Sequence, residues 1–248
     1  MLRIDTAEHV QTWTLDRPPA NAIDGNLVKA IGDAAAAAQA DDDVRCVVLR
    51  GNERFFSAGL DLKALAANGP DDVINFGWGD GIADLWMLEK PTIAAVAGHA
   101  IAGGAILALV CDVRIASSSP KKIGLNETAI GLPFPRGAFE IARHGLAPAT
   151  FGPTILGAGL FGPEEAKTLG YVHEVVAPEA LDETVHATAK RYADIPAIAY
   201  AENKRLFLEP AIERCRNESE EAKNRREAVW KNPDLMMQLA QRLFAAKK

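Results

Sequence analysis

The sequence of 248 residues is poor in cysteine and histidine. Its three cysteines are Cys46, Cys111 and Cys215, an odd number without the CxxC or CxxH spacing of zinc sites and disulfide frameworks. The five histidines show no spacing typical of metal ligands, so we expect no metal site. Together these absences favour a protein of a reducing compartment.

The sequence also has no excess of basic residues and no long apolar run. It has 27 Lys and Arg against 33 Asp and Glu, a formal net charge of −6, whereas a nucleic-acid surface needs clustered positive charge. No apolar stretch is long enough to span a bilayer, and the charged segment MLRIDTAEHV does not resemble a signal peptide. We therefore expect a cytoplasmic protein that contacts neither nucleic acid nor membrane.

The sequence does contain strand patterns that alternate with helix patterns. Residues 2–16 alternate around a short turn and predict a hairpin, and Asp24 is placed to cap a helix through residues 26–40. Three apolar runs predict buried strands: VRCVVLRG from Val44, PTIAAVAG from Pro91 and VRIAS from Val113. This alternation is typical of an α/β core built from crossover units.

From about Pro178 the pattern is helical, and no linker rich in glycine or proline precedes it. We predict a core domain over residues 1–177 and a helical extension over residues 178–248, packed against the core or against a neighbouring subunit. The extension carries an apolar stripe at helical spacing that it could not bury alone, so we expect it to mediate oligomerisation. The stripe includes Leu235, Met236, Leu239 and Leu243.

Two glycine-containing turns each follow a strand-like segment and open a helix: FFSAGLDL from Phe55 and AIAGGAIL from Ala100. A helix start leaves backbone N–H groups without intrahelical partners, and small residues let a ligand approach them closely. Two such turns side by side could direct two N–H groups at one oxygen and form an oxyanion hole. For either turn alone, glycine that serves only packing is the more ordinary explanation.

These two turns, at this spacing, resemble the enoyl-CoA hydratase/isomerase (crotonase) superfamily. DRPPANAID from Asp16 is similar to the N-terminal motif of that family, and GPEEAKTLGYVHEVV from Gly162 is similar to its later helix-to-strand motif. The resemblance covers nearly the whole chain. It implies an α/β (α+β) fold whose repeated ββα units form two sheets, with a helical C-terminal part and assembly into a homotrimer or hexamer.

The resemblance also implies an acyl-CoA thioester substrate in fatty acid metabolism, with coenzyme A as part of the substrate and no separate cofactor. The thioester oxygen would lie between the backbone N–H groups of Leu60 and Gly103. Backbone around Ala58, Gly59 and Asp61 would contact the adenine and the pantetheine of CoA.

The carboxylates of this family distinguish its branches. Hydratases carry two glutamates; the position of the first is Ile106 here, and the position of the second is Glu127. GLNET from Gly124 and the apolar residue at 106 resemble the 3,2-trans-enoyl-CoA isomerases. One mobile carboxylate can move a proton along the acyl chain, whereas hydration divides its work between two carboxylates. Ile106 would also exclude water and raise the pKa of Glu127 by desolvation.

We therefore predict an enoyl-CoA isomerase with Glu127 as its base and with Asn126 either bound to substrate or holding Glu127. The alternatives are a hydratase that uses Glu127 alone and a non-catalytic acyl-CoA-binding protein of the same fold. A carboxylate in such an apolar segment could also be structural, paired with Arg136 or capping the following turn.

Other candidates have ordinary explanations. His99 is expected to be a turn residue hydrogen-bonded to backbone. Lys63, Arg17 and Lys204 could meet CoA phosphates, although a solvated surface position is commoner for such residues. The charged run ERCRNESEEAKNRREAVW is expected to be a solvated helix face.

Overall fold

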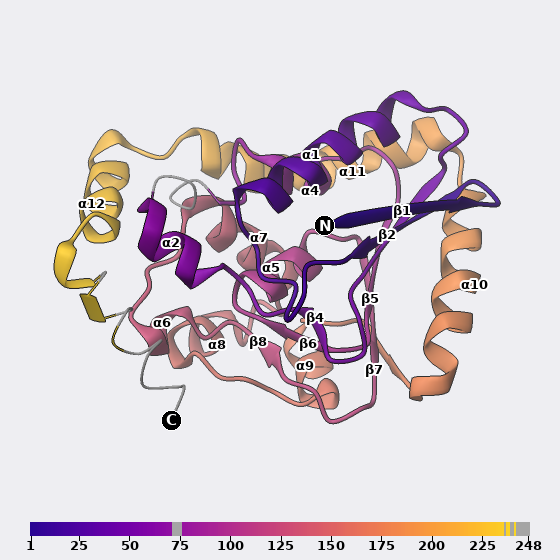
Figure 1. The fold of residues 1–248 in the computed structure, drawn as a ribbon. Helices are drawn as coiled ribbons and strands as arrows, with labels where there is room; N and C mark the ends of the chain where they lie inside the picture. The colour runs from indigo at the N-terminus through magenta and orange to yellow at the C-terminus, as the bar shows by residue number, and fades with distance from the viewer. Residues whose placement is uncertain (71–75, 236, 239–240, 242–248) are drawn as a thin grey trace.

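The computed structural model of the chain describes residues 1–70, 76–235, 237, 238 and 241, and the strands in this part form two sheets (Figure 1). The larger sheet has the order β1-β2-β3-β5-β7-β9, and its neighbouring strands are parallel except for β1 and β2. Its strands are β1 (Leu2–Ala7), β2 (Val10–Leu15), β3 (Cys46–Arg50), β5 (Thr92–Val96), β7 (Val113–Ser117) and β9 (Glu174–Val176). The smaller sheet is parallel and contains β4 (Phe55–Ser57), β6 (His99–Ile101) and β8 (Ile123–Gly124).

The predicted hairpin, helix cap and buried strands are confirmed. Strands β1 and β2 form the antiparallel hairpin, and the three apolar runs are β3, β5 and β7. The carboxylate of Asp24 accepts the N–H of Leu27 at 2.9 Å and caps α1 (Gly25–Ala40), because the first N–H groups of a helix have no partner within it.

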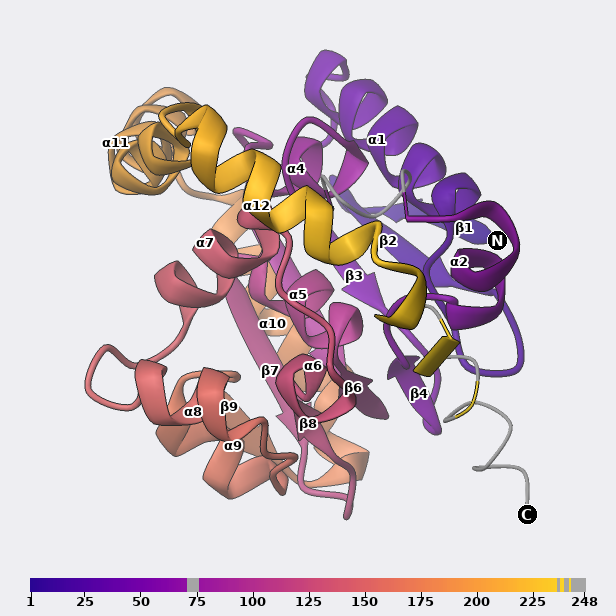
Figure 2. The ribbon, with the colours of Figure 1, turned by 90° about the vertical axis from the view of Figure 1, so that its left-hand side faces the viewer.

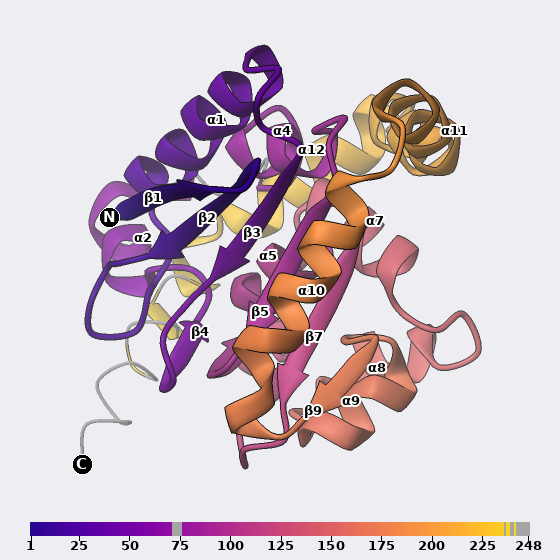
Figure 3. The same cartoon turned by 90° about the vertical axis from the view of Figure 1, so that its right-hand side faces the viewer.

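The larger sheet is covered on both faces, which explains why its central strands are apolar throughout. In β3, Val47 and Leu49 face the main core, while Cys46 and Val48 face the opposite side, as the two-residue period of a strand requires. The main core is closed by helices α1, α4 (Gly81–Trp86), α5 (Gly103–Leu109) and α7 (Arg136–Gly145). Helix α10 (Leu181–Ala193) covers the opposite face (Figure 3).

Three successive units share the pattern of a long strand, a short strand and a helix. The units are β3-β4-α2, β5-β6-α5 and β7-β8-α6, with α2 at Leu62–Asn68 and α6 at Glu127–Ile130. Because β4, β6 and β8 are parallel neighbours, their carboxyl ends lie along one edge of the smaller sheet. The starts of α2, α5 and α6 are therefore brought together, and the predicted ββα architecture with two sheets is confirmed.

The remaining helices follow these units. They are α8 (Phe151–Gly157), α9 (Pro163–Leu169), the 3₁₀ helix η1 (Pro178–Ala180), α11 (Ala197–Arg216) and α12 (Glu220–Trp230). No helix among the described residues is long and apolar enough to cross a membrane. The division of the chain at residue 177 stays a prediction.

The charged run expected to be a solvated helix face is in fact the end of α11, a turn and the whole of α12. The prediction is wrong at the end of α12, where Trp230 is fully buried. Figure 2 shows α12 passing across the molecule towards α2 and α6. Of the predicted apolar stripe, Leu235 is buried beside Trp230, while Met236, Leu239 and Leu243 lie outside the described residues.

Candidate active site

The two glycine turns touch each other at the edge of the smaller sheet. Gly59 has φ +87°, and a β-carbon there would lie 2.8 Å from the carbonyl oxygen of Ile101 and 3.0 Å from the peptide nitrogen of Gly103. A β-carbon on Gly103 would in turn lie 3.4 Å from the peptide nitrogen of Leu60. The positive φ and the close approach both require glycine at position 59. The backbone nitrogens of Leu60 and Gly103 are therefore near neighbours.

Among the described residues neither of these N–H groups has a partner, whereas those of Ala58, Gly59, Asp61 and Ala102 are bonded. The N–H of Ala58 donates to Ala20, that of Gly59 to the Ser57 hydroxyl, and that of Asp61 to Ile23. Within the described part of the chain, no hydrogen bond has the Leu60 or Gly103 N–H as donor. Two adjacent unpaired donors at helix starts are what stabilisation of a developing oxyanion requires.

The second turn is held by tight packing and carries backbone strain. A β-carbon on Gly104 would lie 2.1 Å from the carbonyl oxygen of Ser57, so only glycine fits there. Ala102, just before α5, has φ +53° and ψ −128°, a conformation that non-glycine residues rarely adopt. Such outliers persist where the surrounding structure enforces them, and they cluster at functional sites.

The N-terminal motif from Asp16 secures the first turn. Asn21 is buried, and its side-chain amide donates to the carbonyls of Phe55 and Phe56 in β4. The Ser57 hydroxyl donates to the Asn21 carbonyl at 2.7 Å. Ile23 holds both neighbours of Leu60: its N–H donates to the Gly59 carbonyl and its carbonyl accepts the Asp61 N–H, each at 2.8 Å. The motif thus fixes the strand and turn that carry the Leu60 N–H.

Arg17 adds an ionic link to this arrangement. Its guanidinium lies 2.7 Å from the Asp61 carboxylate and 3.0 Å from that of Asp24, while Asp61 caps the first turn of α2. Burial by itself raises the pKa of Asp61, but the hydrogen bonds from Arg17 and the α2 backbone outweigh it and lower that pKa. The suggestion that Arg17 meets CoA phosphate has no support in these contacts; the sequence did not reveal its role in holding the turn.

Glu127 begins α6 and is buried, with 7% of its surface exposed. Its Oε2 atom is buried without a hydrogen-bond partner. No described Lys, Arg or His forms an ion pair with it. Burial raises the pKa of this carboxyl from 4.5 to about 8, because the charged form loses its hydration and the hydrogen bond from its own backbone N–H offsets only part of that cost. A carboxyl in this state takes up a proton readily.

The two structural roles predicted for the Glu127 side chain, pairing with Arg136 and capping the following turn, are not observed. Arg136 pairs with Glu140 at 3.0 Å and donates to the Arg214 carbonyl, so it is not the partner of Glu127. The turn after α6 is closed by backbone, with the Leu132 N–H donating to the Glu127 carbonyl at 2.9 Å. The Glu127 side chain is thus used neither in an ion pair nor as a cap of that turn.

Ile106 and Asn126 were predicted to lie beside Glu127, and the structure places them in different surroundings. Ile106 is fully buried in α5, the helix that starts at Gly103. Asn126 precedes Glu127 but does not cap α6, and its Oδ1 atom is also buried without a partner. No hydrogen bond between the side chains of Asn126 and Glu127 is found among the described residues. Tyr171, which sequence analysis missed, accepts the Leu125 N–H at 3.1 Å and anchors the strand end that leads into α6.

The remaining candidates have structural roles. His99 accepts the Lys122 N–H at 2.9 Å, which confirms its prediction as a turn residue bonded to backbone. Lys204 was expected at the surface or near CoA phosphate, and this is wrong: it is buried and lies 2.8 Å from Asp112. Among the described residues, no group of three or more His, Cys, Asp and Glu could hold a metal ion.

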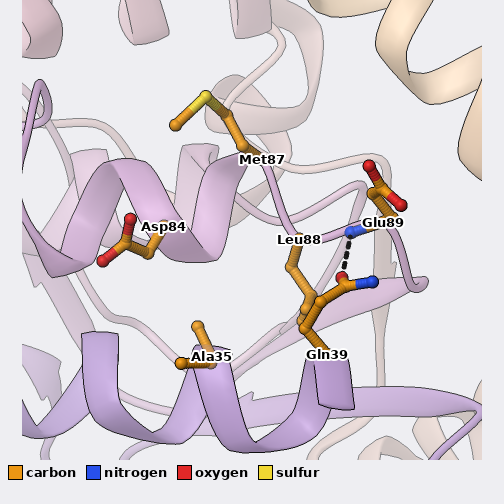
Figure 4. Close-up of a pocket in the computed structure, with 7 residues that line it drawn as sticks. Ala35, Gln39, Asp84, Met87, Leu88 and Glu89 are labelled. Atoms are coloured by element: carbon orange, nitrogen blue, oxygen red, sulfur yellow. Dashed lines mark hydrogen bonds between the residues drawn. The ribbon is translucent and has the colours of Figure 1, made fainter. Parts of the chain in front are cut away.

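A separate pocket of about 360 Å³ lies between α1 and the segment that follows α4 (Figure 4). The Gln39 side chain accepts the Glu89 N–H at 3.1 Å across one end of it. The lining residues are Ala35, Ala36, Gln39, Asp84, Met87, Leu88 and Glu89. None of the predicted site residues lines this pocket, so it is distinct from the candidate site.

The family model described as enoyl-CoA hydratase/isomerase matches residues 5–231. The chain belongs to this family. Carnitinyl-CoA dehydratase from Salmonella heidelberg (strain SL476) is 35% identical over 198 residues, which cover 78% of this chain and 75% of that protein. The predicted superfamily and fold are confirmed, and the chain is an acyl-CoA-processing enzyme of the crotonase superfamily.

Solved structures agree on the fold. The human mitochondrial delta3-delta2-enoyl-CoA isomerase matches with a TM-score of 0.88 and 23% identity, over 99% of this chain and 98% of that chain. A Mycobacterium tuberculosis enoyl-CoA isomerase matches with a TM-score of 0.77 and 26% identity, over 92% of this chain and 96% of that chain. The same mycobacterial protein is elsewhere called a probable enoyl-CoA hydratase. The names of these relatives therefore do not distinguish an isomerase from a hydratase.

Proposed function

We propose that the protein isomerises 3-enoyl-CoA to 2-trans-enoyl-CoA in fatty acid metabolism. The observation that carries this proposal is the buried carboxylate of Glu127, which forms no ion pair and has an unpartnered Oε2, with the apolar and fully buried Ile106 where a hydratase has its other glutamate. Isomerisation moves one proton, so one carboxylate suffices and no cofactor besides the CoA of the substrate is needed.

In the proposed reaction the thioester oxygen accepts hydrogen bonds from the Leu60 and Gly103 N–H groups. Glu127 removes a proton from C2, and the resulting dienolate carries its charge on the thioester oxygen, where the two donors stabilise it. The same glutamate then returns the proton to C4, which places the double bond between C2 and C3. Atoms and charge balance without water, and Ile106 limits the access of water to the carboxylate.

The raised pKa of Glu127 suits both halves of this proton transfer. A carboxylate whose conjugate acid has a pKa of about 8 is a stronger base than an ordinary glutamate. A pKa near the working pH allows the group to give the proton back as readily as it takes it. Backbone around Ala58, Gly59 and Asp61 is proposed to contact CoA; since their N–H groups are bonded internally, these contacts would use other atoms.

A hydratase or dehydratase that uses Glu127 alone is the second candidate. The carnitinyl-CoA dehydratase relatives, at 35% identity, favour it. In that reaction Glu127 would remove the C2 proton, and the departing hydroxyl would need a proton from the same carboxyl. The absence of a carboxylate at position 106 argues against this candidate, because it removes the group that would share the work.

The test is a parallel turnover assay with 3-hexenoyl-CoA and 2-hexenoyl-CoA. We expect turnover of the first to 2-trans-hexenoyl-CoA and little hydration of the second. Glu127→Gln should keep acyl-CoA binding and lower isomerisation by at least ~10²–10⁴-fold, the range for a general acid–base residue. Hydration of 2-hexenoyl-CoA as the main activity would favour the second candidate. Unchanged isomerisation in folded Glu127→Gln would show that this carboxylate is structural.

We also propose that the protein is a homotrimer or hexamer. Helix α11 presents three large apolar side chains to solvent in the single chain: Ile198 at 89%, Leu206 at 59% and Phe207 at 66% exposure. Burial of such a surface in a subunit interface would stabilise the assembly. Sedimentation should give a trimer or hexamer, and Phe207→Glu should weaken it; a stable monomer at micromolar concentration would contradict the proposal.

A further inference from the structure

Trp230, the last residue of α12, is fully buried in a cluster that reaches the candidate site. The buried members of this cluster are Leu65, Leu132, Trp230 and Leu235, and Leu60, Leu62 and Ile130 pack against it. The cluster therefore includes the residue whose N–H is a proposed oxyanion donor, the helix that follows it, and the end of the helix that starts with Glu127.

The indole N–H of Trp230 has no hydrogen-bond partner, although it is buried. An indole N–H can only donate, and a buried donor without an acceptor costs free energy that a phenylalanine would avoid. Buried Trp side chains usually find a partner for this group. The unpaired donor thus points to an acceptor that the protein itself does not supply.

The distance along α6 relates this donor to the proposed chemistry. Helix α6 has four residues and is about 6 Å long at 1.5 Å per residue. Glu127 stands at its start, while Ile130 and Leu132, at and beyond its end, contact the Trp230 cluster. Leu235 follows the same path, since its Cδ1 lies 4.0 Å from the β-carbon position of Gly131. The cluster around Trp230 therefore adjoins the end of α6 that is opposite to Glu127, and it also adjoins Leu60.

Two further unpartnered polar atoms belong to Asn126 and Glu127, at the start of α6. The described residues have six buried side-chain atoms without a partner, and three of them belong to Asn126, Glu127 and Trp230. Oε2 of Glu127 is explained by its proposed catalytic role. Oδ1 of Asn126 and Nε1 of Trp230 are not, and both are suited to a polar ligand, since one accepts and the other donates.

We propose that Trp230 is a specificity-determining residue whose indole N–H donates to an oxygen on the acyl chain, beyond the carbons that react. The preferred substrates would then be acyl-CoA thioesters with a hydroxyl or carbonyl oxygen on the distal part of the acyl group. This inference rests on the proposed function only for the placement of the acyl group beside Glu127. A site that hydrogen-bonds a substrate oxygen discriminates against the analogue that lacks it, because the buried donor is then left unpaired.

The test uses pairs of saturated acyl-CoA thioesters in which a terminal hydroxyl takes the place of a terminal methyl group, so that both members have the same number of non-hydrogen atoms. None of these compounds can isomerise or add water. The pairs are 4-hydroxybutanoyl-CoA with pentanoyl-CoA, 5-hydroxypentanoyl-CoA with hexanoyl-CoA, and 6-hydroxyhexanoyl-CoA with heptanoyl-CoA. Calorimetry should show at least about fivefold tighter binding of the hydroxylated member in one pair, the range of one net hydrogen bond. Trp230→Phe should remove that preference, and Trp86→Phe, at another buried Trp outside the cluster, should keep it.

Equal affinities within all three pairs for the wild-type protein would overturn the proposal, whether or not Trp230→Phe folds. A preference that survives in folded Trp230→Phe would overturn it as well, because another group would then bind the oxygen. In the wild-type protein with ¹⁵N-labelled tryptophan, the Trp230 indole resonance should shift with the hydroxylated ligand and not with its alkyl partner. Because binding is measured without turnover, these outcomes stay separate from success or failure of the isomerase assay.

Discussion

Substitution of Glu127 by glutamine is expected to change how the stability of the folded protein depends on pH. The carboxyl of Glu127 has a pKa of about 8 in the folded chain, against an ordinary value of 4.5, because burial disfavours its charged form. Between these two values the folded protein retains a proton that the unfolded chain has released. The contribution of this group is therefore fully present below about pH 4.5, and it is lost as pH rises to about 8.

The size of the effect follows from the two pKa values. A difference of about 3.5 units corresponds to about 5 kcal/mol at most, of which about 4 kcal/mol falls between pH 5 and pH 9. Glutamine has no proton to lose in this range, so the free energy of unfolding of Glu127→Gln should not fall with pH for this reason. Relative to wild type, the variant should thus gain about 4 kcal/mol in its free energy of unfolding between pH 5 and pH 9. For a chain of this size that is roughly 10 °C in Tm.

The assay is thermal unfolding of both proteins from pH 5 to pH 9, without acyl-CoA. The comparison between variant and wild type cancels the titration of groups that the two proteins share. Glu165→Gln, on the exposed face of α9, controls for the loss of one carboxylate at the surface. Parallel Tm profiles for wild type and Glu127→Gln would refute the reasoning, since they would mean that Glu127 is solvated or paired in the folded protein.

The fold could be predicted where local pattern and tertiary structure agree. Asp24 correctly predicted the start of α1, because a capping residue is recognisable from its type and position. The three apolar runs correctly predicted β3, β5 and β7, because strands that are buried on both faces are apolar throughout. The short strand β4 lies within FFSAGLDL, which the sequence predicts only as a glycine-containing turn. Three residues carry too little periodicity to identify a strand, and β4 exists because β6 pairs with it and Asn21 binds its carbonyls.

The site could be predicted in part, and the failures concern side chains whose partners are distant in sequence. Gly59 and Gly104 of the two turns are informative because their positions admit no side chain. The roles of Arg17 and Lys204 could not be predicted, because no local pattern indicates their partners. Arg17 pairs with Asp61 and Lys204 pairs with Asp112, each far along the chain. A charged residue that reads as solvated can thus be buried when the fold supplies its partner.

The end of α12 shows the same limit. Its last turn follows a run of charged residues, and only the tertiary contacts with Leu65 and Leu132 reveal that Trp230 is buried. Helical periodicity in α12 is weak, so a prediction from pattern assigns the entire segment to solvent. The proposed link between this helix and the acyl group therefore depends on the structure and not on the motifs.

Three further substitutions or measurements test the candidate site. Gly104→Ala should destabilise the protein by about 1–3 kcal/mol and reduce turnover, because its β-carbon would lie 2.1 Å from the Ser57 carbonyl oxygen. The control is Gly157→Ala, which should be neutral or stabilising because no atom lies within 4 Å of the new β-carbon. Arg17→Ala should lower kcat about tenfold with a smaller change in Tm, because it removes the ion pair that holds the turn carrying Leu60. The control is Arg3→Ala, which removes an exposed ion pair with Asp5 and should change neither kcat nor Tm. The third measurement is the pH dependence of kcat/KM for 3-hexenoyl-CoA. Glu127 must be ionised to remove the C2 proton, and its pKa in the free protein is about 8. The ionised fraction therefore rises about tenfold per pH unit below that value, so log kcat/KM should climb with a slope of about one and level off near pH 8. A plateau that is already reached at pH 5 would mean that the proton is taken by a group with an ordinary carboxyl pKa, and Glu127 would not be the base.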